Sequence, residues 1–253
     1  MINLKTKDWT ISNIDTILFD KDGTFIDLHY FWGKMTELRA KEVIKRFNMN
    51  DELFPKLCMY LGYDITTGKM LKDGITALYS RPKIIDIFCE NLKECRVHTT
   101  HQEIEKIFDY INTIFYKEME KYTKPIESAI DFIRKVNSLG IKCGIVTSDS
   151  KESTLLTLKH FHWEDLFKSV IGRESTPEHK ESGIPAKMAL EELGADPKTT
   201  IMIGDAPMDY LAAVNAGIKK TILVATGQIE KESLLETSPY TVNTLNEIEI
   251  EVE

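Results

Sequence analysis

Five short apolar runs, each ending in a turn or polar residue, constrain the fold of this chain more than any other feature. They are rich in Ile, Val, Leu and Thr, and they span residues 16–19, 142–146, 169–172, 200–203 and 221–225. Continuous apolarity over so few residues is typical of strands buried on both faces, as in parallel sheets. Segments with helical spacing alternate with these runs, so right-handed βαβ units in an open α/β sheet are expected.

The clearest of the intervening helices begins at Pro125 and ends at Gly140. Its apolar residues follow helical spacing, with a proline at the start and a glycine at the end: Ile126, Ala129, Ile130, Ile133 and Val136. Further helices are expected at about residues 152–160, 185–193 and 208–216.

The stretch from about residue 27 to 124 interrupts this alternation, because it shows helical periodicity and no clear strand. Helices are expected around residues 31–47 and 84–92, and one long apolar stripe follows: Ile104, Ile107, Phe108, Ile111, Ile114, Phe115, Met119 and Tyr122. The sequence therefore predicts an α/β core domain from residues 1–26 and 125–253, with a helical domain over residues 27–124 inserted after the first strand. The C-terminal EIEIEVE alternates and is either an edge strand or a frayed end.

The composition of the 253 residues, 42% hydrophobic and 28% charged, is that of a packed globular protein. Lys and Arg total 32 against 40 Asp and Glu, a formal net charge of −8, so no nucleic-acid partner is expected. No stretch approaches the roughly 20 apolar residues of a membrane span, and the N-terminus lacks a signal-peptide core. A cytoplasmic protein without a membrane partner is therefore expected. The cysteines lack metal or disulfide spacing and are expected to be idle thiols: Cys58, Cys89, Cys95 and Cys143.

An acidic pair follows the first apolar run, in the sequence Asp20-Lys21-Asp22-Gly23-Thr24. A strand over residues 16–19 delivers Asp20 at its carboxyl end, where open α/β sheets place their ligands. Gly23 allows a tight turn, so both carboxylates can converge on one site. Two acids repel each other there, and a hard cation such as Mg²⁺ relieves the repulsion. An acidic turn after a strand is nevertheless common without any ligand.

A second acidic motif, Gly204-Asp205 with Asp209, follows the run at residues 200–203. Asp205 ends the strand, and Asp209 lies at the opening of a helix, where a negative charge is favoured. Alone the pattern is weak, because Asp209 can simply be a first-turn acid.

Two smaller signals lie between the acidic motifs. Thr147-Ser148-Asp149-Ser150 ends one strand and opens a helix, so hydroxyls and free backbone N–H groups can cradle a phosphate or merely cap the helix. Lys180 precedes the helix expected from residue 185, and a single loop lysine is usually a solvated surface residue.

Taken in order, these motifs resemble the haloacid dehalogenase superfamily of phosphotransferases over residues 14–26 and 125–228. Residues 20–24 are similar to motif one, Thr147 to motif two, Lys180 to motif three, and Gly204-Asp205 with Asp209 to motif four. The resemblance implies a Rossmann-like core with an inserted helical cap, as in relatives of phosphoglycolate phosphatase and β-phosphoglucomutase.

The resemblance also implies roles for the acidic residues. Asp20 would attack a phosphoryl group to form an aspartyl-phosphate, and Asp22 would act as general acid and then as general base. Mg²⁺ would be held by Asp20, the backbone carbonyl of Asp22 and Asp205, with Asp209 in support through water or an outer contact.

Three residues are implied as phosphate-binding groups, namely Thr147, Ser148 and Lys180. Motif-three relatives often have a proline directly after the lysine, whereas Glu181 follows here, so Lys187 is the competing choice. Lys180 is preferred because its distance to residues 193–194 suits the family spacing and Lys187 falls within a predicted helix. Asp149 either adds to the acidic rim or has no role.

The resemblance narrows the reaction. A second Asp at position 22 is similar to phosphatases and phosphomutases, whereas family members that cleave carbon–halogen bonds carry another residue there. A cap that closes over its substrate favours a small phosphorylated metabolite. Arg81 or Lys72 could pair with a substrate anion, and His29 and Trp32 are weaker candidates; all four are equally explained as surface or packing residues.

The predicted function is therefore a Mg²⁺-dependent phosphatase of a small phosphate monoester. The alternatives are a phosphomutase of a sugar phosphate, or a non-catalytic binding protein on the same scaffold. The intact set of Asp20, Asp22, Lys180 and Asp205 argues against the binding protein, because a binder has little need of two acids so close together.

Overall fold

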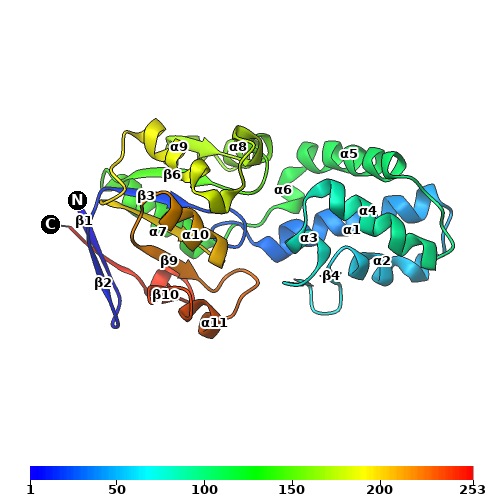
Figure 1. Cartoon of the computed structure of the whole chain (residues 1–253), viewed down its shortest axis with the longest axis horizontal. Coiled ribbons are helices and arrows are strands. Elements are labelled where there is room, and N and C mark those ends of the chain that lie inside the picture. Colours follow the sequence, from blue (N-terminus) through cyan, green and yellow to red (C-terminus); the bar gives the residue numbers. More distant parts are fainter. Residues whose placement is uncertain (253) are drawn as a thin grey trace. The chain divides into compact units, whose positions relative to one another are not determined.

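The computed structural model describes residues 1–252, and the chain divides into two compact units (Figure 1). One unit comprises Met1–Asp27 together with the chain from Pro125 onward, and the other comprises Leu28–Lys124. Asp27, which the sequence analysis assigned to the inserted domain, lies with the first unit.

The first unit is built on a six-stranded sheet in the order β10-β9-β8-β3-β6-β7, and every pairing in it is parallel. Its strands are β3 (Thr16–Phe19), β6 (Lys142–Val146), β7 (Ser169–Ile171), β8 (Thr200–Gly204), β9 (Thr221–Val224) and β10 (Thr241–Val242). All residues of β3, β7, β8 and β9 are buried, as continuous apolar runs require. The predicted fold class is confirmed.

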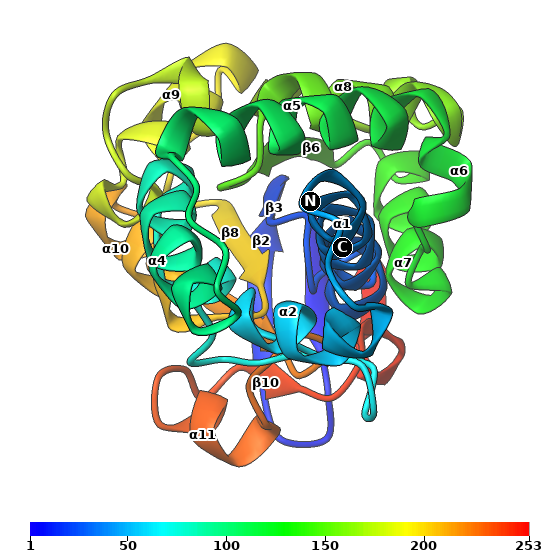
Figure 2. The same ribbon diagram turned by 90° about the vertical axis from the view of Figure 1, so that its right-hand side faces the viewer.

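The helices of this unit are α7 (Glu127–Ser138), α8 (Lys151–His160), α9 (Ile184–Leu193), α10 (Pro207–Asn215) and α11 (Lys231–Leu235). Figure 2 shows α7 and α10 on opposite sides of β3 and β8, so the sheet is covered on both faces. Alanines of α9 and α10 pack on strand residues such as Leu18 and Met202, which lets these helices approach the sheet closely.

A second sheet in this unit joins the two ends of the chain. It has three antiparallel strands in the order β11-β1-β2, namely β1 (Ile2–Lys5), β2 (Thr10–Ile14) and β11 (Glu249–Val252). The alternating C-terminal segment is therefore an edge strand paired with β1. β1, β2 and β10 were not predicted from the sequence, because strands of two to five residues carry little periodicity of their own.

The second unit is helical, as predicted, with α1 (Leu28–Arg46), α2 (Phe54–Tyr60), α3 (Ile75–Leu78), α4 (Arg81–Glu94), α5 (His101–Lys117) and α6 (Met119–Tyr122). A hairpin of β4 (Tyr63–Asp64) and β5 (Lys69–Met70) was not predicted. The expected single stripe over residues 104–122 is wrong as one helix. Glu118 leaves the helical conformation, with a φ of −121°, and separates α5 from α6.

None of the helices within residues 1–252 combines the length and the apolar character that a bilayer crossing requires. All four cysteines are free, and three of them, Cys58, Cys89 and Cys143, are buried. The cytoplasmic location stays a prediction.

Candidate active site

The first acidic residue, Asp20, lies at the carboxyl end of the central strand. β3 pairs with β6 on one side and β8 on the other, with Phe19 level with both Ile145 and Ile203. The Asp20 N–H donates to the Ile203 carbonyl at 2.8 Å, so the sheet register extends to Asp20. Its side chain is 9% exposed. The strand thus delivers a buried carboxylate at the edge where parallel sheets place ligands.

The turn after Asp20 depends on Gly23, whose φ is +86°. Its N–H donates to the Ile26 carbonyl at 2.8 Å, which folds residues 20–26 back on themselves. A Cβ added to Gly23 would lie 2.6 Å from the Asp205 Cγ, well inside an ordinary contact. Any larger residue at this position would therefore be both strained and in conflict with the Asp205 side chain.

The second acidic motif comes from β8 and the start of α10. Asp205 follows β8 and is buried, and Asp209 lies in the first turn of α10. The Ala206 N–H donates to Asp209 Oδ2 at 3.0 Å, so this carboxylate also satisfies a free backbone donor at the helix start.

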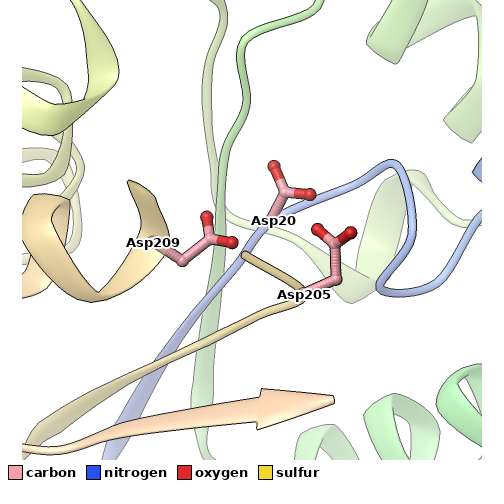
Figure 3. A group of neighbouring side chains, drawn as sticks. All are labelled: Asp20, Asp205 and Asp209. Atoms are coloured by element: carbon pink, nitrogen blue, oxygen red, sulfur yellow. The ribbon is translucent and has the colours of Figure 1, made fainter. Parts of the chain in front are cut away.

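Three carboxylates from these two motifs meet at one point. Oxygens of Asp20, Asp205 and Asp209 lie within 4.8 Å of one another, and all three residues are buried (Figure 3). The side chain of Asp22 is not part of this group, although its backbone carbonyl was the atom predicted to bind metal.

Lys180 contacts two members of the acidic group. Its Nζ lies 2.5 Å from Asp20 Oδ1 and 2.6 Å from Asp209 Oδ1, and its side chain is 3% exposed. The residue lies in a 3₁₀ turn, Lys180–Ser182, just before α9, whereas the competing Lys187 is exposed on α9 itself. Of the two candidate lysines, only Lys180 is brought to the acidic group.

The electrostatics of the group show that its negative charge is not balanced by the chain. Burial raises the pKa of Asp20 to about 7 despite the opposing effect of Lys180, and Asp209 adds to the rise. Burial, then the charges of Asp20 and Asp209, also raise the pKa of Asp205. Burial alone would lower the pKa of Lys180, but the two carboxylates beside it more than offset this and raise it.

A divalent cation fits this donor set. Three carboxylates against one ammonium leave a net excess of two negative charges in a buried site. Carboxylate oxygens are the donors that Mg²⁺ prefers, and a cation among them removes the repulsion that raises the pKa of Asp20 and Asp205.

The motif-two residues lie at the end of β6, the neighbour of β3. Thr147 is buried, its N–H donates to the Ile171 carbonyl at 3.0 Å, and its Oγ1 accepts from the Asp149 N–H at 3.1 Å. Ser148 is exposed, and its hydroxyl donates to Met208 Sδ at 3.8 Å. Both residues therefore lie on the same edge of the sheet as Asp20.

Lys21 was not predicted as a site residue, and its side chain is completely buried. Its Nζ lies 2.6 Å from Asp22 Oδ1 and 3.0 Å from Asp149 Oδ2. Burial alone would lower the pKa of Lys21, but the charges of Asp22 and Asp149 more than offset this and raise it, so the side chain stays charged. The available signal was the position of this lysine directly after Asp20, at the end of a central strand. Burying an apolar residue there would cost less free energy than burying a lysine.

The loop after β9 was also missed. The Thr226 hydroxyl donates to the Gly23 carbonyl at 2.5 Å, and a Cβ added to Gly227 would lie 2.6 Å from the Asp205 Cγ. The signal in the sequence was a Thr-Gly pair directly after the last strand run, at the same edge of the sheet as the two acidic motifs.

The predicted substrate residues lie in the second unit. Arg81 is the first residue of α4 and forms an ion pair with Asp109 of α5 at 2.5 Å, and Lys72 is exposed. His29 Nδ1 accepts from the Met70 N–H at 3.1 Å, and Trp32 packs edge-on against Phe31. These contacts lie within the second unit, and a substrate role for His29 or Trp32 stays a prediction.

Comparison with known proteins identifies the family. Residues 77–224, more than half of the chain, match the family model described as haloacid dehalogenase-like hydrolase. The chain belongs to this family. Pyrophosphatase PpaX of Bacillus pumilus is 25% identical over 229 residues, which cover 90% of this chain and 91% of that protein. Phosphoglycolate phosphatase of Neisseria meningitidis is 26% identical over 210 residues, covering 82% and 79%.

A solved structure supports the fold of this haloacid dehalogenase-like hydrolase over nearly its whole length. The Haemophilus somnus protein, described as a predicted phosphoglycolate phosphatase, has a TM-score of 0.69 at 16% identity and covers 93% of this chain and 96% of that one. The predictions of the superfamily and of an enzyme are therefore confirmed: the chain is a hydrolase of a family whose curated relatives are phosphatases.

Proposed function

We propose that this protein is a Mg²⁺-dependent phosphatase that hydrolyses a small phosphorylated metabolite through an aspartyl-phosphate on Asp20. The observation that carries the proposal is the buried group of Asp20, Asp205 and Asp209 with the Lys180 ammonium beside it. An ion-pair network that served stability alone would not need buried acids in excess of its cations. A site for a metal ion and a phosphoryl group does need them.

Asp20 and Asp205 would hold Mg²⁺, with the backbone carbonyl of Asp22 as a further oxygen donor and Asp209 in support. When bound, the ion would offset the excess negative charge and polarise the phosphoryl oxygens. Asp209 Oδ2 is already engaged by the Ala206 N–H, which suits a supporting role.

In the first step, a carboxylate oxygen of Asp20 attacks phosphorus and the bond between phosphorus and the leaving oxygen breaks. The carboxyl group of Asp22 gives its proton to the leaving oxygen, so that the leaving group departs as a neutral hydroxyl compound. Lys180, Thr147 and Ser148 would contact the phosphoryl oxygens, over which negative charge spreads in the transition state.

In the second step, the Asp22 carboxylate takes a proton from a water molecule as the water oxygen attacks phosphorus. The bond between phosphorus and the Asp20 oxygen breaks, which restores the Asp20 carboxylate and releases inorganic phosphate. Asp22 ends protonated, as it began. The cycle consumes one water and yields inorganic phosphate and the dephosphorylated product.

The inserted helical unit is an argument for a small substrate. It enters the chain directly after the turn that carries Asp22, at Leu28, and leaves it at Lys124. A mobile cap at such a position excludes water and bulky substrates from the reacting group. The named relatives are a pyrophosphatase and a phosphoglycolate phosphatase, both acting on small phosphate compounds. Lys72 and Arg81 stay the predicted substrate contacts of the cap.

Phosphate release from p-nitrophenyl phosphate tests the proposal. We expect turnover with Mg²⁺ that is abolished by EDTA and by Asp20→Asn. The matched control is Asp131→Asn, an exposed acid of α7 with a side chain 72% exposed, which should keep wild-type turnover. Equal activity in Asp20→Asn and wild type would contradict the assigned nucleophile.

A panel of small phosphates would then identify the substrate class, with pyrophosphate, 2-phosphoglycolate and hexose phosphates as its first members. Preferred release of phosphate from one of them supports the proposal. Isomerisation of a hexose phosphate without phosphate release would identify a phosphomutase, and tight binding without turnover would identify a binding protein.

A further inference from the structure

Lys21 joins the turn after β3 to the turn after β6. Its ammonium group lies 2.6 Å from Asp22 Oδ1 and 3.0 Å from Asp149 Oδ2, and its side chain is fully buried. β3 and β6 are adjacent parallel strands, so the bridge spans two neighbouring strand ends at the edge of the sheet that carries Asp20. The contact is therefore set by tertiary structure and not by the order of residues in the motif.

Stability alone does not account for this lysine. Removing an ammonium group and two carboxylates from water is costly, and apolar residues of similar volume can often replace a buried ion pair without loss of stability. The neighbours Phe19 and Phe25 are fully buried, so an apolar side chain would suit the surroundings of Lys21. A charged group retained in such a place has a further task.

The geometry indicates what that task is. Asp22 follows the turn residue Lys21 and precedes Gly23, so its backbone leaves the strand direction at this point. The side chain of Asp22 is 12% exposed, whereas the side chain of Lys21 is fully buried. An ion pair at one carboxyl oxygen restrains rotation of the whole carboxyl group, and Asp149 holds the lysine from the other side.

We propose that Lys21 is a positioning residue: its ammonium donates to Asp22 Oδ1, so that the other carboxyl oxygen, Oδ2, carries the proton to the leaving oxygen, and Asp149 anchors the lysine. The inference rests on the proposed function. It assigns a role to two residues, Lys21 and Asp149, that contact neither the metal nor the phosphoryl group in the proposed mechanism.

A leaving-group series tests this role, because only poor leaving groups need a proton. In Lys21→Met, kcat/KM for 2,4-dinitrophenyl phosphate should fall less than about 3-fold. For phenyl phosphate it should fall about 10- to 100-fold, a part of the ~10²–10⁴ that general acid catalysis provides. The plot of log kcat/KM against leaving-group pKa should therefore become steeper. Equal loss for all substrates, or no loss, would overturn the proposal.

Two further variants separate positioning from general destabilisation. Asp149→Asn keeps the shape of the anchor but removes its charge, and it should steepen the same plot by a smaller amount. Ile133→Ala removes a fully buried side chain of α7 and should lower the melting temperature without changing the slope. If Lys21→Met does not fold, the slope of Asp149→Asn decides: an unchanged slope overturns the proposal.

The outcome for the wild type distinguishes the two proposals. Absence of hydrolysis of every aryl phosphate by the folded, Mg²⁺-supplied wild type would overturn the proposed function and this inference together. Normal hydrolysis by the wild type with an unchanged slope in Lys21→Met and Asp149→Asn would overturn this inference alone.

Discussion

Gly227 provides a direct test of Asp205 as a metal ligand. A Cβ added at Gly227 would lie 2.6 Å from the Asp205 Cγ, whereas ordinary contacts begin at about 3.4 Å. The carboxyl carbon would therefore have to retreat by roughly 0.8 Å. Gly23 also packs closely against the Asp205 side chain: a Cβ added at Gly23 would likewise lie 2.6 Å from the Asp205 Cγ. The Asp205 carboxyl group therefore has little room to retreat.

The expected loss in Gly227→Ala follows from that displacement. Mg²⁺ binds oxygen at about 2.0–2.1 Å with little tolerance, so a shift of roughly 0.8 Å removes Asp205 from its coordination shell. We expect Mg²⁺ affinity to fall about 10- to 100-fold, comparable to the loss of a supporting metal-site contact. The melting temperature of the metal-free protein should change by only a few degrees, because a single side chain has to move.

Calorimetric titration of the metal-free protein with Mg²⁺, together with the Mg²⁺ dependence of phosphate release, measures this effect. The control is Gly140→Ala, which introduces the same methyl group at a φ of +79° with no atom within 4 Å of it. It should cost about 1 kcal/mol of stability and leave Mg²⁺ affinity unchanged. Wild-type Mg²⁺ affinity in a folded Gly227→Ala protein would refute the reasoning.

Three other predictions concern the acidic group and its lysine. Asp205→Asn should weaken Mg²⁺ binding about 10-fold or more in calorimetry. Asp22→Asn should instead lower kcat about 10²-fold and largely keep the Mg²⁺ affinity. Equal Mg²⁺ affinity in wild type and Asp205→Asn would refute the assignment of Asp205 as a metal ligand. Burial raises the pKa of Asp20 from 3.8 to about 7, so between these two pH values the folded metal-free protein binds a proton that the unfolded chain has lost. The free energy of unfolding therefore falls as the pH rises from about 4 to 7. In EDTA, thermal melts should show Asp20→Asn gaining stability over wild type between about pH 4 and 7, and a constant difference would contradict this. Lys180→Met should lower kcat/KM for p-nitrophenyl phosphate about 10²-fold or more, while Lys187→Met should not; the reverse order would exchange the two assignments.

Local patterns in the sequence were sufficient for most of the α/β core. The runs at residues 16–19 and 200–203 are buried strands because a strand covered on both faces must be apolar throughout. The same patterns place Asp20 and Asp205 at strand ends, since a turn residue must follow each run. Motif order then identified the family, as the match over residues 77–224 confirms.

Periodicity was less informative where elements are short or interrupted. The stripe over residues 104–122 continues in phase across Glu118, so apolar spacing alone could not show that α5 and α6 are separate helices. β1 and β11 pair with each other from opposite ends of the chain. The alternation of residues 247–253 allowed an edge strand, but only the pairing with β1 decided between a strand and a frayed end.

The chain's own order of residues determined which groups could form the site: an acid at each of two strand ends, a glycine at the first turn, and an inserted helical segment. Only the tertiary structure decided which of the charged residues are buried together. Lys180 meets Asp20 across 160 positions, and Lys21 turns away from solvent because Asp149 from the neighbouring strand end meets it. The physical reason is that burying a charge costs less free energy where an opposite charge replaces the lost water, and the packing of the sheet fixes which residues can be that partner.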